Sequence, residues 1–230
     1  MVNSMNAWSS RYGRWAVSLS LAAACLALVM AFSARPEPLP SDTDRNEQVL
    51  RGRLLVLHHA CGDCHGGGGN PAAPNWLTGW NPSSPPGGFQ DFQIGPYHVY
   101  ARNLTPDNTT GLGRFSERQI FNALRYGLRP GETPDVEITS TTPGEGNYPA
   151  RPKYLAVAMP WPVFRHMSDQ ELWDIAAYLK HGLKPVKNPV PDSEGPPDFW
   201  ASEYTPEKVG TYPAPPFPTA NEMSLKTSSR

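Results

Sequence analysis

Apolar and small residues recur at helical spacing between Asp44 and Cys61. They fall on one side of a helix, in the order Val49, Gly52, Leu55, Val56 and His59. Asp44, with Glu47 three residues later, is predicted to cap the start of this helix. A glycine inside a helix costs about 1 kcal/mol relative to alanine. We therefore expect Gly52 to lie where another helix approaches closely, the alternative being an exposed glycine that is merely tolerated.

Capping boxes followed by apolar stripes predict two further helices. Ser116 and Gln119 form the first box, and Ser168 and Glu171 form the second. Their stripes are Ile120, Phe121 and Leu124, which lead to Gly127, and Leu172, Ile175, Ala176 and Leu179, which lead to Gly182. These faces are the predicted core of a mostly α-helical domain.

Long loops separate the predicted helices, in keeping with the 27 prolines and 20 glycines of this 230-residue chain. Residues 71–96 and 129–154 are irregular, which is unusual inside a compact domain unless side chains pack on a bound cofactor. Periodicity is lost after Pro185. We predict one domain over residues 44–187, followed by a Pro-rich tail at residues 188–230 that lies extended over the domain or is disordered.

The N-terminal part of the chain has the pattern of an export signal or a membrane anchor. Residues 1–15 carry only two charges, Arg11 and Arg14, and residues 16–34 carry none. The length of this apolar run favours a retained transmembrane anchor over a cleaved signal peptide, which stays the alternative. In both cases the arginines remain cytoplasmic and the rest is exported, with residues 35–43 as a linker.

The overall charge argues against nucleic acid as a partner. The formal net charge is −1 at neutral pH, and the charges form no block of one sign. Three cysteines, two of them close together, do not make a disulfide scaffold.

The pair Cys61 and Cys64 is followed directly by His65, which is the attachment pattern of c-type haem. Both thiols would form thioethers with one porphyrin, and the imidazole would bind the iron as proximal ligand. A thioredoxin-like pair would need no histidine there and would want a βαβ context. A zinc site would need a second ligand pair, and the remaining cysteine is Cys25 in the apolar run. A disulfide between the two cysteines leaves His65 unexplained.

Met159 is the best candidate for the sixth iron ligand. Pro160 follows it and favours an extended backbone at Met159, so the segment is expected to form a stiff strap opposite His65. The alternative is that Met159 is an ordinary core methionine that fills a gap in the packing. Met167 has a sufficient role next to the Ser168 cap, and His98 is the best candidate for a bis-histidine haem.

Several segments together resemble a class I c-type cytochrome over about residues 44–187. They are Arg51–Val56, Cys61–His65, Asn103–Asp107, Gly111–Ser116, Met159–Trp161, Ser168–Leu172 and Ala176–Lys180. More narrowly, the chain is similar to the cytochrome subunits of bacterial membrane-bound alcohol and gluconate dehydrogenases. The resemblance implies covalent haem c at Cys61 and Cys64, axial ligands His65 and Met159, and packing of Gly52 on the last helix. Those subunits usually carry three haems, whereas this chain has one such motif, and its Pro-rich tail is not a recognised feature of the family.

The expected function is that of a single-haem electron carrier in the periplasm. No substrate is expected to bind the iron, because both of its axial positions are taken. The resemblance implies redox protein partners of the respiratory chain, such as a membrane dehydrogenase or a terminal oxidase, and no catalytic residues of the chain's own. The competing hypotheses are a haem enzyme or gas-binding sensor with an open distal position, and an exported binding domain without haem. Arg102, Arg114, Arg125 and Trp161 are plausible partners of the haem propionates.

Overall fold

The computed structural model describes residues 42–84, 90–195, 199–210 and 212–224. The predicted N-terminal segments 1–15 and 16–34, with most of the linker, lie outside this range. No helix within the described ranges is long and apolar enough to cross a membrane.

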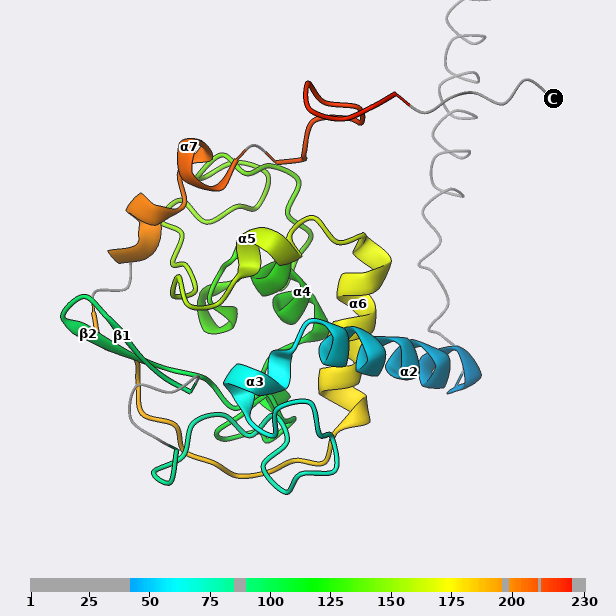
Figure 1. Ribbon diagram of the computed structural model, residues 1–230, viewed down its shortest axis with the longest axis vertical. Helices are drawn as coiled ribbons and strands as arrows, with labels where there is room; N and C mark the ends of the chain where they lie inside the picture. The colour runs from blue at the N-terminus through cyan, green and yellow to red at the C-terminus, as the bar shows by residue number, and fades with distance from the viewer. Residues whose placement is uncertain (1–41, 85–89, 196–198, 211, 225–230) are drawn as a thin grey trace, which may run out of the picture. The chain divides into compact units, whose positions relative to one another are not determined.

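The described chain is mostly helical, with one small sheet (Figure 1). Its two strands, β1 (Asp91–Ile94) and β2 (Tyr97–Tyr100), pair antiparallel with Asp91 opposite Tyr100. The helices are α2 (Asp42–His58), α3 (Cys61–His65), α4 (Glu117–Tyr126), α5 (Trp161–Phe164), α6 (Asp169–Ala177) and α7 (Pro206–Val209). Short turns of other helix types are η1 (Leu112–Arg114), η2 (Pro130–Glu132), η3 (Tyr178–Gly182) and η4 (Phe199–Glu203).

Helix α2 packs against α6 and its continuation η3, and α4 packs against α5 and α6 (Figure 1). The core between them contains Val56 from α2, Ile120 and Phe121 from α4, and Leu172 and Ile175 from α6. The predicted apolar stripes therefore form the core, as helical periodicity requires.

Both predicted capping boxes of the later helices are confirmed. The backbone N–H of Gln119 donates to Ser116 Oγ, and the Ser116 N–H donates to Gln119 Oε1, each over 3.1 Å. Ser168 and Glu171 exchange the same two bonds at the start of α6. The cap predicted at Asp44 is wrong, because the chain is already helical at Asp42. The Asp44 carboxylate instead lies in the first turn, where the helix dipole favours negative charge.

Gly52 lies at the closest approach of α2 and α6. A Cβ atom at this position would lie 1.8 Å from the Asp174 carbonyl oxygen and 2.9 Å from Tyr178 Cβ. The prediction that Gly52 permits close helix packing is confirmed, and the alternative of an exposed glycine is wrong.

The structure adds regular elements to the predicted loops and tail. The β1–β2 hairpin straddles the end of the loop predicted over residues 71–96, with Gly95 at φ 58° in its turn. In the tail, η4 and α7 are helical, and Trp200 is only 2% exposed. This part of the tail therefore packs on the domain, which was one of the two alternatives, but it forms helical turns where an extended chain was expected.

Candidate functional site

A cavity of about 630 Å³ lies among the helices, and its lining is predominantly apolar. Residues from α2, α3, α4, α6 and the β1–β2 hairpin contribute to its walls, together with the segment around Met159. This volume lies within the range of pockets that hold small molecules and cofactors.

The two cysteines lie in the short helix α3, which is separated from α2 by a turn with Ala60 in the left-handed conformation. Gly62 between them is buried, and a Cβ there would lie 2.1 Å from the Gly68 carbonyl oxygen and 2.3 Å from the Trp76 ring. Cys61 and Cys64 are free thiols that line the cavity. Burial raises the pKa of the Cys61 thiol to about 11 and also raises that of Cys64. Both sulfurs are therefore neutral thiols at neutral pH, and no disulfide joins them in this structure.

His65 is held by a backbone carbonyl behind its ring. Its Nδ1 lies 2.7 Å from the Arg102 carbonyl oxygen, and the side chain is nearly buried. A carbonyl accepts only, so Nδ1 carries the proton and Nε2 has a free lone pair. Burial lowers the pKa of His65, which also favours the neutral ring. This carbonyl-to-imidazole arrangement is the one that orients a metal-binding histidine.

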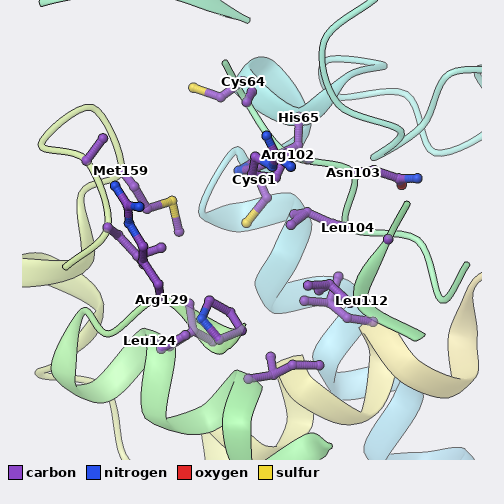
Figure 2. Close-up of a pocket in the computed structure, with 18 of the residues that line it drawn as sticks. Cys61, Cys64, His65, Arg102, Asn103, Leu104, Leu112, Leu124, Arg129 and Met159 are labelled. Carbon is purple, nitrogen blue, oxygen red and sulfur yellow. Dashed lines mark hydrogen bonds between the residues drawn. The ribbon is translucent and has the colours of Figure 1, made fainter. Parts of the chain in front are cut away.

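Met159 lies across the cavity from the cysteine–histidine helix (Figure 2). Its sulfur points towards the space between the two walls (Figure 2). The segment is not the fully extended strap that was expected: the Met159 N–H donates to the Ala156 carbonyl over 2.9 Å, and the Trp161 N–H donates to Met159 O over 2.8 Å. These bonds form a turn that places the side chain at the cavity wall.

The other candidate ligands of the sequence analysis do not line this cavity. His98 lies on β2, where its Nδ1 is 3.0 Å from Asp91 Oδ1 and its side chain is 42% exposed. Met167 packs against the core next to the α6 cap. Met159 is thus the one methionine of the described residues that lines the cavity with His65.

Three arginines lie at the cavity: Arg102, Arg114 and Arg129. Burial lowers the pKa of Arg102, the nearby carboxylate of Asp192 raises it, and the charges of Arg114 and Arg129 also lower it. Three guanidinium groups around one cavity favour an anionic group at this edge.

Two predicted propionate partners, Arg125 and Trp161, do not line the cavity. Arg125 is instead paired with Asp169 and with the Arg165 carbonyl. Arg129 was missed, because no local pattern distinguishes it from other loop arginines. Its position follows from the tertiary contact of its guanidinium with the Tyr154 carbonyl.

No family model matches the chain, but several curated proteins do. It is 28% identical to the fructose dehydrogenase cytochrome subunit of Gluconobacter japonicus over 160 residues, which are 70% of this chain and 26% of that protein. It is 30% identical to the gluconate 2-dehydrogenase cytochrome c subunit of Pantoea cypripedii over 159 residues, or 69% and 28% of the two chains. The chain is similar to dehydrogenase cytochrome c subunits.

A further relative is the cytochrome c subunit of the quinone-dependent alcohol dehydrogenase of Gluconacetobacter polyoxogenes. It is 30% identical over 125 residues, which cover 51% of this chain and 22% of that subunit. These matches confirm the resemblance found in the sequence. The aligned regions span about a quarter of the length of each of these relatives.

The residues at the cavity fit a haem c group. Two thiols, an imidazole with a free Nε2 and a thioether on the facing wall are the donor set of such a cofactor. The apolar walls suit the macrocycle, and the arginines suit its carboxylates.

Proposed function

We propose that the chain is a single-haem electron carrier, with haem c attached through Cys61 and Cys64 and the iron bound by His65 and Met159. The observation that carries this proposal is the placement of Met159 and His65 on facing walls of one apolar cavity. The names of the relatives support it, since each of these is a cytochrome subunit of a dehydrogenase.

A bound haem would supply a one-electron Fe(II)/Fe(III) couple, and the side chains of this protein would set how it is used. His65 Nε2 and the Met159 thioether would both hold the iron, which would leave no place for a substrate. Thioether ligation and the apolar walls would both favour the reduced state, because the oxidised iron carries the extra positive charge.

Arg102, Arg114 and Arg129 would pair with the haem carboxylates at the cavity edge. An arginine–carboxylate pair is strong when it is partly shielded from water. Carboxylates there would also offset the repulsion from Arg114 and Arg129, which adds to burial in lowering the pKa of Arg102.

We infer that the haem domain works in the periplasm, tethered by residues 16–34 as a membrane anchor or free after cleavage of that segment. Its partners would be redox proteins, namely a membrane dehydrogenase or a terminal oxidase. A tether would raise the effective concentration of the carrier near such a partner.

The test is Met159→Ala, with Met167→Ala as a matched control because Met167 packs on the core without lining the cavity. We expect Met159→Ala to keep its haem, to lose the far-red methionine–iron band of the oxidised protein, and to bind CO about tenfold faster or more when reduced. This follows if the open form is only about 0.1–10% populated in the wild type. Met167→Ala should keep the wild-type band and CO rate.

Two outcomes would contradict the proposal. If the wild-type protein lacks the band and binds CO as fast as Met159→Ala, the distal position is open and the protein is a haem enzyme or sensor. If the purified protein contains no haem, or if the variant with both cysteines replaced by alanine retains it covalently, the attachment at Cys61 and Cys64 is wrong. A pyridine haemochrome assay measures this and also counts haems per chain.

A further inference from the structure

The C-terminal tail contacts the residues that flank Met159 in the chain. The orange elements η4 and α7 lie near α5, which follows Met159 directly in the chain (Figure 1). Two sets of hydrogen bonds join them: Tyr204 Oη donates to the Leu155 carbonyl over 2.8 Å, and Arg165 Nη2 donates to the carbonyls of Val209 and Gly210 over 2.7 and 2.8 Å. The tail is therefore bonded to the chain on both sides of Met159.

The Tyr204 ring lies against the aromatic residues that flank the same segment. Its centroid is 4.7 Å from that of Trp161 and 5.1 Å from that of Tyr154, and both pairs meet edge to face. Such pairs contribute about 0.5–1.5 kcal/mol beyond the area that they bury. Trp161 is only two residues from Met159, so contacts that fix its ring also restrain the backbone that carries Met159.

The Met159 segment is also bonded to the end of α4. The Leu155 N–H donates to the Gly127 carbonyl over 2.7 Å, while the Leu155 carbonyl accepts from Tyr204. Burial raises the pKa of Tyr204 to about 12, so its hydroxyl remains a donor throughout the physiological pH range. Trp200 anchors the tail nearby, with 2% of its surface exposed.

We propose that Tyr204 is a positioning residue, through which the C-terminal tail braces the Met159 segment and holds its thioether at the cavity. This inference rests on the proposed His65–Met159 ligation for its functional consequence, but the brace itself does not depend on the iron. Without the brace, the segment that carries Met159 would lose the hydrogen bond from Tyr204 to Leu155 and the ring contacts of Tyr204 with Tyr154 and Trp161. Met159 would then leave the iron more often.

The experiment compares Tyr204→Phe and Tyr204→Ala with the wild-type full-length holoprotein. Tyr204→Phe removes only the bond to Leu155, and one hydrogen bond corresponds to an increase of about fivefold in the open fraction. Tyr204→Ala also removes the ring contacts, and we expect an increase of about tenfold or more. Both appear as faster CO binding to the reduced protein, because this rate follows the open fraction.

Two controls separate the brace from general stability. Phe217→Ala removes an aromatic residue that is 55% exposed in the same tail. Trp173→Ala removes a ring stacked on Phe121, 4.6 Å between centroids, in the core away from the cavity. We expect both to bind CO at the wild-type rate, even where Trp173→Ala lowers the melting temperature.

Amide hydrogen exchange over residues 155–161 gives a readout that does not depend on ligation. Faster exchange there in Tyr204→Ala, but not in Phe217→Ala, supports the brace. If the wild type binds CO rapidly but Tyr204→Ala still loosens this segment, the proposed ligation fails and the brace stands. If exchange and CO binding both stay at wild-type values in the two Tyr204 variants, or change equally in Trp173→Ala, the brace is wrong. Should Tyr204→Ala not yield holoprotein, Tyr204→Phe decides by the same two measurements.

Discussion

Replacing Gly52 with alanine tests the packing of α2 on α6, because two opposing effects predict different signs. Intrinsic helix propensity favours alanine by about 1 kcal/mol. The structure opposes the change, since the new Cβ would lie 1.8 Å from the Asp174 carbonyl oxygen and 2.5 Å from its carbon. These are backbone atoms, which cannot rotate away as a side chain could.

The size of the loss can be worked out from these contacts. A carbon and an oxygen in contact are normally separated by about 3.3 Å or more, so the helices would have to move apart by roughly 1.5 Å. Inserting one carbon into a packed core costs about 1–3 kcal/mol or more. The shift would also stretch the ion pair between Arg51 and Asp174, whose Nε–Oδ2 distance is 2.8 Å and whose carboxylate is only 2% exposed. Because Arg51 is half exposed and the pair would be stretched rather than broken, this adds only part of the roughly 3–5 kcal/mol that losing one partner of a fully buried pair costs.

We therefore expect Gly52→Ala to lower the free energy of unfolding by about 2 kcal/mol after the propensity gain is subtracted. This corresponds to a fall in melting temperature of about 4–8 °C for a chain of this size. The assay is thermal unfolding of the holoprotein followed by far-UV circular dichroism.

Gly69→Ala is the matched control, because no atom lies within 4 Å of a Cβ at that position. It should unfold within about 0.5 kcal/mol of the wild type. A Gly52→Ala protein as stable as the wild type, or more stable, would refute the reasoning, since it would mean that α2 and α6 have room between them.

Two other changes test contacts away from the haem ligands. Lys180→Met removes the ammonium group that donates to the carbonyls of Gly113 and Phe115 over 2.8 and 2.6 Å. We expect denaturant unfolding to show that the free energy of unfolding falls by about 1–3 kcal/mol. Lys184 is exposed, and Lys184→Met should leave the free energy of unfolding unchanged. Asp107→Asn tests a pH effect. Hydrogen bonds from Thr110, and to a lesser degree from Thr109, lower the pKa of Asp107 from 3.8 to about 2. Because the folded-state pKa is lowered, this contribution to stability is present above about pH 4 and is lost as the pH falls towards 2. Unfolding measured across this interval should depend less on pH in Asp107→Asn, and identical pH profiles would contradict the assignment.

The sequence was informative wherever the signal is local. The cysteine–histidine motif places both attachment cysteines and one candidate iron ligand within five residues, and short-range geometry alone holds them on one helix. The boxes at Ser116 and Ser168 also succeed because each involves residues three apart. The Asp44 cap failed because several acidic or hydroxyl residues near it, such as Asp42, have similar capping propensities.

The hairpin and the helical turns of the tail were missed for a different reason. The strands of the hairpin are four residues each, and a pattern that short does not stand out in a Pro- and Gly-rich loop. Trp200 and Tyr204 lie in a segment without periodicity, so nothing local indicates that they are held by distant parts of the chain.

By itself, the sequence determined the helices, the attachment motif and the short set of candidate ligands, because these depend on spacing along the chain. Only the tertiary structure decided which candidate faces His65, which arginines line the cavity, and which residue of the tail contacts the Met159 segment. Those relations join residues tens of positions apart, and they follow from how the helices and the tail pack together.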